Sequence, residues 1–427
     1  MKTNLMRLLY TLAVFLLLPV ALLYLLLRSR RQPGQFKHLA ERFGFYPTRS
    51  GSPLIWLHAV SVGETRAAEP LVHGLRARYP RHRILVTHMT STGRETGEAL
   101  FGKGVERCYL PLDYPAAVAR FLDHFQPQAG ILMETELWPN LIRGMRARAI
   151  PLFLVNARLS AKSHAAYRKF GGLARDSLAS VKVVAAQGPD DARRLADLGA
   201  GDVRVTGSLK FDIAPPAAQL ELGRAFRREV GDARPVLVAG STREGEEALL
   251  LDFLPKIDVE RLLLAIVPRH PQRFNEVAQL LEARGIRYQR RSSGEPVSPE
   301  TRVVLGDSMG EMFAYYTACD VAFVGGSLVP LGGQNLIEAC AAGKPVLVGP
   351  SNYNFSEATE RAVEAGAAIR VADAEGLARE AGRLLRDPGA ARRMAQAALE
   401  FAAAHRGATA RVLDLIDIEN GGGGNRK

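Results

Sequence analysis

Short apolar runs alternate with longer amphipathic segments along most of this chain. The apolar runs predict strands at residues 54–57, 83–87, 129–133, 151–155, 181–185, 236–239, 262–267, 302–305, 321–324 and 345–348. Apolar positions at helical spacing predict helices at residues 64–79, 92–102, 219–230 and 335–342. Because strands that alternate with helices are typical of β-α-β units, the pattern predicts an α/β protein with parallel sheets.

The alternation is interrupted once, between residues 212 and 235. Pro215 and Pro216 lie in this gap, and two successive prolines stop regular structure, so we predict a hinge there. The sequence therefore predicts two domains of similar size, residues 32–212 and 213–420, with a ligand cleft at the carboxyl ends of their sheets. The glycine-rich tail, residues 421–427, is predicted to be disordered.

An uncharged apolar run at residues 8–27 precedes the first domain. Its length of ~20 residues is what a helix needs to cross a bilayer. Arg28, Arg30 and Arg31 follow, and the more positive flank normally stays in the cytoplasm. We therefore predict that residues 1–31 are a membrane anchor helix and that the body is cytoplasmic. A cleaved signal peptide and a buried core helix are the alternatives, although the arginine cluster is not typical of a cleavage site.

Charge and composition narrow the choice of partner. A formal net charge of +12 suits an anionic partner, such as nucleic acid, a membrane surface or a phosphorylated substrate. Aromatic residues do not interleave with basic runs, so no nucleic acid is expected. Residues 143–182 hold nine Lys and Arg but one acidic residue, Asp176, which indicates either a solvated basic face or a surface for anionic lipid or a phosphorylated acceptor. The cysteines lack metal-ligand spacing and are predicted to be small buried side chains; they are Cys108, Cys319 and Cys340.

The most specific motif is the glycine-rich segment at residues 325–338, which follows a predicted strand and opens a predicted helix. Glycines let a backbone approach a ligand closely, and the free N–H groups of a helix's first turn attract an anion such as phosphate. Glu338, one turn into the helix, can accept hydrogen bonds from sugar hydroxyls. The spacing is neither that of a phosphate-binding P-loop nor that of a dinucleotide fingerprint. An ordinary glycine-rich turn with helix capping is the alternative.

Three further loops follow predicted strands of the same domain, at residues 240–246, 267–271 and 306–312. Arg269 in the second of these can project into the cleft and meet a phosphate. Each loop alone is equally well explained as a structural turn. Together with the glycine-rich segment they indicate a nucleotide-type donor site.

Carboxylates follow two predicted strands of the first domain. Glu64 begins a helix, where the helix dipole stabilises a negative charge, and Glu134 and Glu136 come directly after the strand at residues 129–133. Two carboxylates at one sheet edge can support general-base chemistry on a hydroxyl. Helix capping is the alternative role for Glu64. No D-x-D triplet, which often holds a divalent ion on a nucleotide diphosphate, occurs in the chain, so no metal is expected.

At these residues the chain resembles the 3-deoxy-D-manno-octulosonic acid (Kdo) transferases of Gram-negative lipopolysaccharide synthesis. The resemblance covers nearly the whole length. Its blocks lie at residues 34–44, 58–64, 134–140, 156–160, 207–212, 267–270 and 325–338.

The resemblance implies a GT-B glycosyltransferase fold, with two Rossmann-like domains, an interdomain cleft and an N-terminal membrane helix. It implies an inverting transferase that takes Kdo from CMP-Kdo to lipid IVA, a tetraacylated lipid A precursor, with no metal or other cofactor. Its partners would then be CMP-Kdo, the lipid A precursor and inner-membrane lipid, at the cytoplasmic face of the bacterial inner membrane.

The resemblance also assigns roles to individual residues. Glu64 would be the general base, and Glu134 and Lys210 would stabilise the transition state. The residues expected to hold the nucleotide are Pro268, Arg269, Met309, Gly310, Glu311, Asn335, Leu336, Ile337 and Glu338.

Three other classes of protein compete with this interpretation. A tethered lipid-binding protein needs the basic surface but not Glu64. A transferase using a nucleoside-diphosphate sugar needs the glycine-rich loop but also a group that binds a second phosphate. A periplasmic binding protein needs a cleaved signal, which the flank at residues 28–31 argues against.

Overall fold

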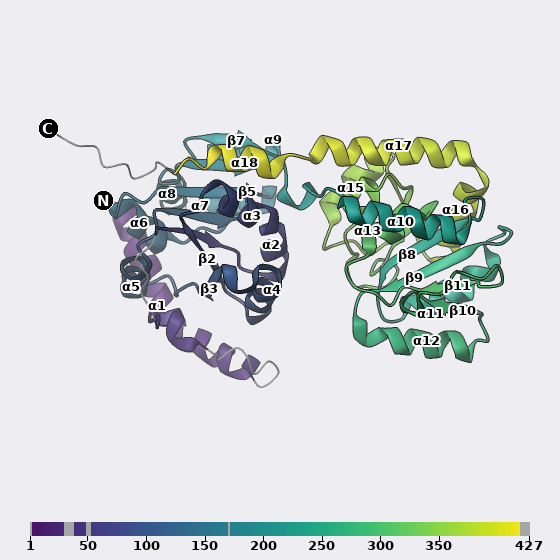
Figure 1. Ribbon diagram of the computed structural model, residues 1–427. Coiled ribbons are helices and arrows are strands. Elements are labelled where there is room, and N and C mark those ends of the chain that lie inside the picture. Colours follow the sequence, from purple (N-terminus) through teal and green to yellow (C-terminus); the bar gives the residue numbers. More distant parts are fainter. Residues whose placement is uncertain (1, 30–37, 48–52, 170, 419–427) are drawn as a thin grey trace. The chain divides into compact units, whose positions relative to one another are not determined.

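The chain forms two compact units in the computed structural model, which describes residues 2–29, 38–47, 53–169 and 171–418 (Figure 1). The first unit combines Met1–Asp212 with Gly407–Lys427, and the second is Ile213–Arg406. Three predicted features lie outside the described residues: the tail, the arginines at positions 30 and 31, and the motif residues 34–37.

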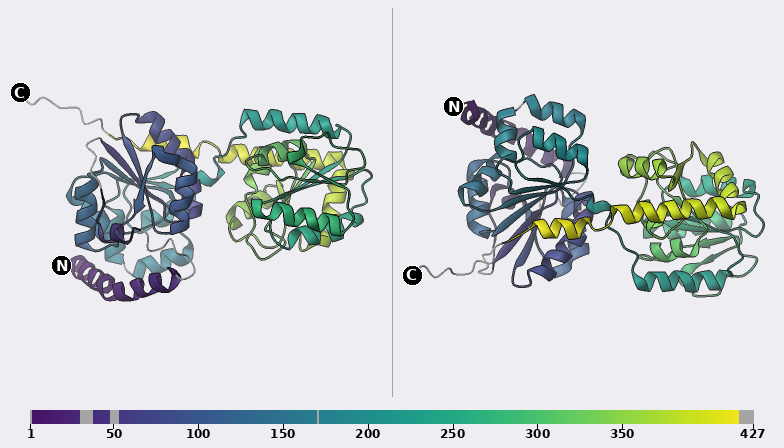
Figure 2. Two further views of the ribbon diagram at one scale, coloured as in Figure 1. Left: turned by 60° about the horizontal axis from the view of Figure 1, so that its bottom comes forward. Right: turned by 90° about the horizontal axis from the view of Figure 1, so that it is seen from above.

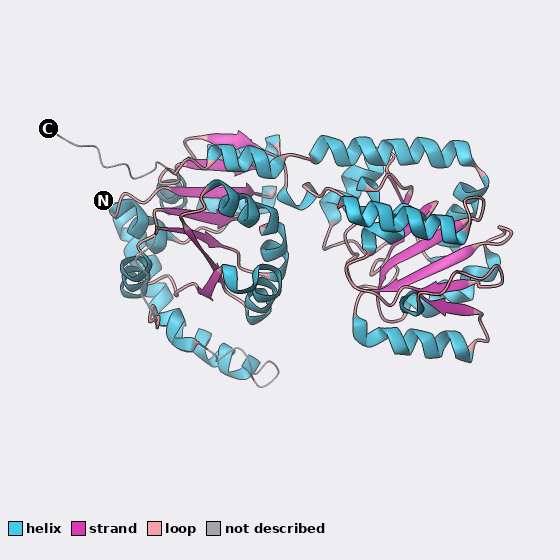
Figure 3. Cartoon of the chain, in the orientation of Figure 1, coloured by secondary structure: helices cyan, strands magenta, loops and turns pink. Residues whose placement is uncertain are grey.

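Within its described residues, the first unit is built on a parallel sheet with the strand order β3-β2-β1-β4-β5-β6-β7. Helices flank the strands on both faces of the sheet (Figures 2 and 3). The strands are β1 (Leu54–His58), β2 (Arg83–His88), β3 (Glu106–Tyr109), β4 (Ala129–Met133), β5 (Leu152–Ala157), β6 (Val183–Ala186) and β7 (Val203–Val205). The helices are α1 (Lys2–Ser29), α2 (Val62–Ala67), α3 (Glu69–Arg78), α4 (Ser91–Phe101), α5 (Pro115–Phe125), α6 (Pro139–Ala147), α7 (Ala161–Lys169), α8 (Gly171–Leu178), α9 (Pro189–Asp197) and α18 (Ala408–Leu415), with short 3-10 turns η2 (Leu39–Phe43), η3 (Gly102–Gly104) and η4 (Leu209–Phe211).

The second unit repeats this plan with the strand order β10-β11-β9-β8-β12-β13-β14, again all parallel in the described part of the chain. The strands are β8 (Val236–Thr242), β9 (Leu263–Pro268), β10 (Tyr288–Arg290), β11 (Val303–Leu305), β12 (Val321–Val324), β13 (Val346–Val348) and β14 (Ala368–Arg370). The helices are α10 (Ala217–Val230), α11 (Glu246–Phe253), α12 (Phe274–Ala283), α13 (Met312–Ala318), α14 (Ile337–Ala341), α15 (Ser356–Glu364), α16 (Ala374–Arg386) and α17 (Pro388–His405), with 3-10 turns η5 (Leu254–Lys256), η6 (Pro271–Arg273) and η7 (Arg291–Ser293).

Each sheet has one point where the strand order reverses direction. In the first unit β1 lies between β2 and β4, with Leu57 opposite Ile131. In the second unit β8 lies between β9 and β12, with Ala239 opposite Phe323. Ligands of open parallel sheets bind outside the carboxyl ends of the strands at such points. The loops that follow β1, β4, β8 and β12 are therefore where function is expected.

The central strands are buried on both faces, as the helix cover requires. All residues of β1 and β4 are buried, and so are those of β9 and β12. Strands covered on both faces consist of nearly continuous apolar residues. This is why short apolar runs located them in the sequence.

The last helix, α18, returns to the first unit. Val412 and Ile416 are fully buried there in the same apolar cluster as Leu71, Val72 and Leu75 of α3. The predicted boundary at residue 212 coincides with the end of the first segment of this unit. The predicted second domain, residues 213–420, instead ends at Arg406, because the apolar face of α18 packs against α3.

The predicted anchor forms a helix, α1, that continues through Pro19. Its polar side chains bond to the first unit: Tyr10 donates to Asp113 (2.9 Å) and Thr11 donates to Asn140 (3.2 Å). No helix in the described part of the chain is both long and apolar enough for a membrane crossing. The predicted transmembrane span is therefore not supported.

Candidate active site

Glu64 lies at the point where strand order reverses in the first sheet. β1 ends at His58, and the chain turns at Val60 and Ser61 into α2. Ser61 caps this helix, with its hydroxyl accepting from the Glu64 N–H. This capping places the Glu64 side chain at the start of the helix, at the carboxyl edge of the sheet.

The Glu64 carboxylate is almost fully buried and accepts two hydrogen bonds. Val60 N donates to Oε2 (2.8 Å), and the Ser61 hydroxyl donates to Oε1 (2.9 Å). Burial raises its pKa from 4.5 to about 7; the charges of Glu134 and Glu136 add to the rise, whereas the two hydrogen bonds oppose it. A carboxylate that titrates near neutral pH can accept a proton from a hydroxyl. Both roles considered from sequence, helix cap and general base, are therefore compatible with its geometry.

Glu134 and Lys210, which lie far apart in sequence, form an ion pair in the same unit. The Lys210 Nζ lies 2.9 Å from Glu134 Oε1. Glu134 follows β4 with a positive φ of 57°, which is unusual for a residue other than glycine, while its N–H donates to the Val155 carbonyl. Backbone strain of this kind concentrates at functional sites. The structure thus brings together two of the three residues predicted to be catalytic, and the charge of Glu134 acts on the third, Glu64.

Asn156 organises this site, although its sequence context predicted no role for it. It is fully buried at the end of β5 with a φ of 53°, and its Oδ1 accepts from Leu209 N (2.9 Å) and from the Ser208 hydroxyl (3.3 Å). These bonds fix the turn η4 that carries Lys210. An asparagine between an apolar strand and a polar loop was the available signal, because asparagine tolerates this backbone conformation.

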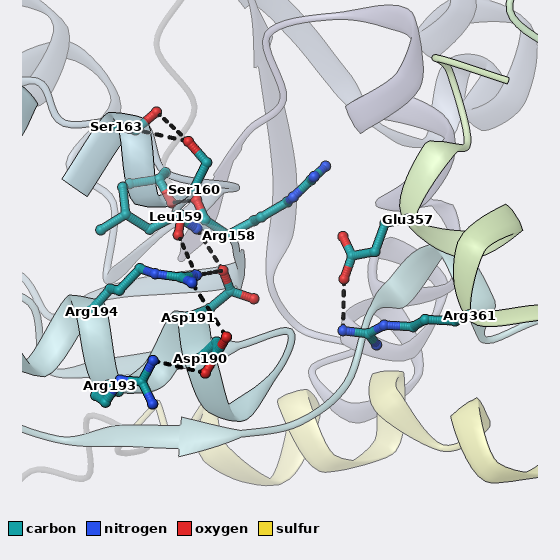
Figure 4. Close-up of polar contacts among 11 residues, drawn as sticks. Arg158, Leu159, Ser160, Ser163, Asp190, Asp191, Arg193, Arg194, Glu357 and Arg361 are labelled. Carbon is teal, nitrogen blue, oxygen red and sulfur yellow. Dashed lines mark hydrogen bonds and ion pairs between the residues drawn. The ribbon is translucent and has the colours of Figure 1, made fainter. Parts of the chain in front are cut away.

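The loop that follows Asn156 is held by the start of α9. Leu159 N donates to Asp191 (2.8 Å), and Arg194 donates to the Leu159 carbonyl (3.0 Å) and to Asp190 (3.3 Å). Figure 4 shows this cluster and the exposed Arg158 side chain, which points away from it. The motif at residues 156–160 is thereby a rigid support beside the Glu134–Lys210 pair.

In the second unit, Pro268 is the last residue of β9, and Arg269 follows the strand as predicted. Arg269 N donates to the Thr242 carbonyl (3.0 Å), which joins this loop to the end of β8. Partial burial lowers the pKa of His270, and the charges of Arg243, Arg269 and Arg273 lower it further. This part of the unit is therefore strongly basic, as the binding of an anion requires.

The segment at residues 309–311 has a different character. Met309 is exposed, Gly310 has a φ of 79°, and Glu311 accepts from the Ser308 hydroxyl (2.6 Å). Arg291 lies 3.6 Å from the Glu311 carboxylate. An exposed methionine and an adjacent backbone turn can contact a flat ligand such as a base.

The predicted residues 335–338 open the short helix α14. Leu336 and Ile337 point into the core, so they can contribute only backbone groups to a ligand. The Ile337 N–H already donates to Asn335 Oδ1 (3.1 Å), and Asn335 Nδ2 donates to Glu338 (3.3 Å). The side chains available to a ligand in this segment are therefore those of Asn335 and Glu338.

The cysteines are buried free thiols, as predicted; they are Cys108, Cys319 and Cys340. Across the described ranges, no group of three or more His, Cys, Asp or Glu side chains is placed to hold a metal ion.

Comparison with known proteins assigns the family. Residues 37–213 match a family model described as 3-deoxy-D-manno-octulosonic-acid transferase, and residues 286–401 match one described as glycosyl transferases group 1. A 3-deoxy-D-manno-octulosonic acid transferase from Bordetella pertussis is 47% identical over 96% of this chain and 98% of its own. The chain belongs to the Kdo transferase family. A transferase of the same name from Haemophilus influenzae is 39% identical, over 96% of this chain and 98% of its own.

The architecture agrees with this membership. The structure of MurG from Acinetobacter baumannii is similar over 86% of this chain and 99% of its own, with a TM-score of 0.55. At 14% identity this likeness concerns the fold alone. Two parallel α/β units of this type fit the predicted GT-B fold, and the Kdo transferase family makes the chain a glycosyltransferase.

Proposed function

We propose that this Kdo transferase takes Kdo from CMP-Kdo and adds it, with inversion, to lipid IVA in lipopolysaccharide synthesis. The observation that carries the proposal is the buried Glu64 carboxylate. It lies at the reversal point of the first sheet and has a pKa near neutrality. Family membership supports the choice of sugar, because the relatives from Bordetella and Haemophilus are named for it.

In the proposed reaction, Glu64 is the general base. The acceptor hydroxyl oxygen forms a bond with the anomeric carbon of Kdo, and the bond from that carbon to the phosphate oxygen of CMP breaks. The hydroxyl proton passes to Glu64, and the electron pair of the broken bond leaves with CMP. A carboxylate that is protonated near pH 7 in the folded protein is well matched to this transfer.

Negative charge develops on the leaving phosphate, and basic groups of the chain offset it. Lys210 beside Glu134 and the Arg269 loop supply positive charge in this proposal. Well-placed electrostatic donors of this type lower a barrier by about 3–4 kcal/mol each. Met309–Glu311 and Asn335–Glu338 would hold the nucleotide through backbone groups and the polar side chains described above. No step of the proposal requires a metal ion or other cofactor.

We also propose that α1 attaches the enzyme to the cytoplasmic face of the inner membrane. With its polar side chains bonded to the domain, α1 exposes an apolar face to its surroundings, formed by Leu5, Leu8, Leu9, Leu12, Leu16 and Leu17. Beside it lies a cavity of about 430 Å³ that is lined in part by Arg7, Arg143 and Arg146, and by Asp176, which forms ion pairs with Arg7 and Arg146. An apolar helix face next to basic side chains is the arrangement that binds an anionic bilayer surface.

The test of the reaction is Glu64→Gln in the full chain, assayed with CMP-Kdo and radiolabelled lipid A precursor. Glutamine keeps the size of the side chain but cannot accept the proton, so kcat should fall by about 10²–10⁴-fold. The melting temperature should change little, because a carboxylate at a helix N-terminus contributes only about 0.3–1 kcal/mol.

Glu69→Gln is the matched control, since Glu69 begins the next helix, α3, and is more exposed. Its turnover should equal that of the parent. Turnover of Glu64→Gln within a few-fold of the parent, with a lower melting temperature, would assign Glu64 to helix capping and leave the base to be sought at Glu134 or Glu136.

A further inference from the structure

Two adjacent carboxylates, Glu246 and Glu247, are fully buried at the start of α11 in the second unit. The residues expected to bind the nucleotide do not include them. A buried carboxylate is costly unless it is hydrogen-bonded or paired with a positive charge. The bonds that these two make therefore indicate what they are for.

Glu246 binds four backbone N–H groups. Its Oε2 accepts from Gly326 (2.5 Å) and Arg243 (2.9 Å), and its Oε1 accepts from Ser327 (3.0 Å) and Leu328 (2.9 Å). Three successive amides of the glycine-rich segment thus donate hydrogen bonds to a single carboxylate of the same chain. Burial raises the pKa of Glu246, while the bonds from the Gly326, Arg243 and Leu328 amides oppose that rise and favour the ionised form.

This arrangement limits which amides of the glycine-rich segment can bind an anion. The sequence indicated an anion site at the first turn of the helix that the segment opens, near Asn335. The amides at positions 326–328, which precede that helix, are occupied by Glu246, which takes the place of an external anion. The segment also approaches β8 so closely that a Cβ on Gly325 would lie 2.6 Å from the Thr242 Cα. Its glycine is therefore required for packing against the strand.

Glu247 holds the neighbouring loop in a similar way. Its Oε1 accepts from the Thr242 hydroxyl (3.0 Å), and its Oε2 forms an ion pair with Arg273 (3.0 Å). The Thr242 carbonyl in turn accepts from Arg269 N (3.0 Å). The two ends of the segment at residues 269–273 are thereby tied to Glu247, one directly and one through Thr242.

We propose that Glu246 and Glu247 are positioning residues, which hold the glycine-rich turn and the Arg269 loop at a fixed spacing for the nucleotide of the donor. The proposal rests on the proposed function for the identity of that nucleotide, CMP. Because the two carboxylates are consecutive at the start of one helix, that helix connects the glycine-rich turn with the Arg269 loop. Their effect on the nucleotide is exerted through these loops.

The test is Glu246→Gln in the full-length protein, with two readouts. Hydrogen exchange of a peptide containing residues 326–328 should become faster, because an amide NH₂ now faces N–H donors and cannot accept from them. The CMP dissociation constant should rise about 10-fold, which corresponds to ~1.4 kcal/mol. The KM for the donor should rise more than kcat falls, which a loss of overall stability alone would not produce.

Glu375→Gln is the matched control, because Glu375 lies in the first turn of α16 in the same unit and is exposed. It should leave exchange and CMP affinity unchanged. Thr242→Val is a milder variant that removes one hydroxyl donor to Glu247 without changing charge, and it should weaken CMP binding a few-fold even where Glu246→Gln does not fold. Parent-like CMP affinity in both folded variants would overturn the proposal.

The two readouts also separate this proposal from the proposed function. If the parent protein does not bind CMP, the proposed donor is wrong. Faster exchange at residues 326–328 in Glu246→Gln would then still support the bracing of the turn, and unchanged exchange would overturn it.

Discussion

The Glu64 side chain combines two roles that sequence alone presents as alternatives. The bonds from Val60 N and the Ser61 hydroxyl are those of a helix cap, yet the carboxylate that accepts them is buried beside two other carboxylates. Capping fixes the position of the side chain, and burial adjusts its proton affinity. A single residue can therefore be both held and activated by the same local structure.

This environment predicts the pH dependence of the enzyme. Because the pKa of Glu64 lies at about 7 and the base must be deprotonated, kcat/KM should increase with pH up to about 7 and then level off. The folded pKa is above the ordinary value of 4.5, so the folded state binds the extra proton between these values. The contribution of Glu64 to stability should thus decrease as pH rises from 4.5 to 7.

Values of kcat/KM and melting temperatures measured from pH 5 to 9 test both statements. In Glu64→Gln the activity inflection should vanish, and so should this part of the pH-dependent stability loss. An inflection that persists unchanged in the variant would belong to another group.

Asn156 yields a second prediction. Asn156→Ala removes the acceptor of Leu209 N and places alanine at a φ of 53°, so unfolding free energy should decrease by about 1–3 kcal/mol. Turnover should also fall, because η4 no longer holds Lys210 beside Glu134. Denaturant unfolding and kcat measure the two effects. Asn156→Gly relieves the backbone strain but not the lost bonds; turnover as high as that of the parent in Asn156→Gly would contradict the positioning role.

Candidate site residues that follow strands could be predicted from the sequence. Residues that act by accepting hydrogen bonds from distant backbone amides could not. Glu64, Glu134 and Arg269 follow apolar runs, and the carboxyl edge of a parallel sheet is where ligands bind. Glu246 and Asn156 are different, because each bonds to amides more than 50 residues away in sequence. No local pattern encodes such a pairing. The occupation of the amides at positions 326–328 by Glu246 could not be predicted for the same reason.

Among the secondary structure elements, the strands that the apolar pattern missed are those at the edges of the two sheets: β3, β7, β10 and β14. β7 is mostly exposed and β10 is only partly buried along its length. An edge strand has one neighbour and incomplete helix cover, so its sequence need not be continuously apolar. The interior strands, covered on both faces, were predicted within a few residues.

Helix α1 shows the opposite limitation, because its apolar sequence was sufficient to predict a helix but not its placement. Tyr10 and Thr11 bond to Asp113 and Asn140, and the Phe15 ring lies 5.3 Å from that of Tyr114. From the sequence, Tyr10 and Thr11 are two uncharged polar residues within an apolar run, and nothing near them indicates that they bond to Asp113 and Asn140. The leucines on the remaining face stay exposed.

The exposed face of α1 predicts how the enzyme binds membranes. Replacing Leu8, Leu12 and Leu16 by Ser should weaken binding to phosphatidylglycerol vesicles at least 10-fold, because each buried leucine contributes about 1.5–3 kcal/mol. The melting temperature in detergent should be unchanged, since these side chains do not pack against the domain. Co-sedimentation with vesicles measures the binding. If the triple variant sediments like the parent, the basic side chains near the cavity carry the attachment instead.

In the molecule as a whole, the first unit is assembled from both ends of the chain. Asp212, where the chain leaves this unit, accepts from Gly407 N (2.9 Å) and Thr409 N (2.6 Å), where the chain returns. Tyr79 also donates to the Ile416 carbonyl (2.7 Å). The helix α18 is therefore an integral part of the core and not a surface extension.

Removing residues 407–427 should consequently unfold the first unit. Burial of Val412, Ile416 and Ile418 contributes about 1.5–3 kcal/mol each, a large share of the 5–15 kcal/mol typical of a domain. Calorimetry should show the transition of the first unit lost or strongly lowered, while that of the second unit remains. Ile416→Ala in the full chain should lower stability by about 2–5 kcal/mol, whereas Asp414→Ala, at an exposed position, should have little effect. A truncated chain with both transitions intact would contradict this.

The return of α18 also has a consequence for biosynthesis. Domains generally fold in order as the ribosome makes them, at about 5–20 residues per second. Here the helix that completes the first unit emerges only after the roughly two hundred residues of the second, a delay of about 10–40 s. Until then the apolar side chains of Leu71, Val72 and Leu75 lack their cover. The first unit of the nascent chain is thus incomplete while the second is already being made. The exposed apolar surface of α3 is therefore the expected binding site for a chaperone during translation.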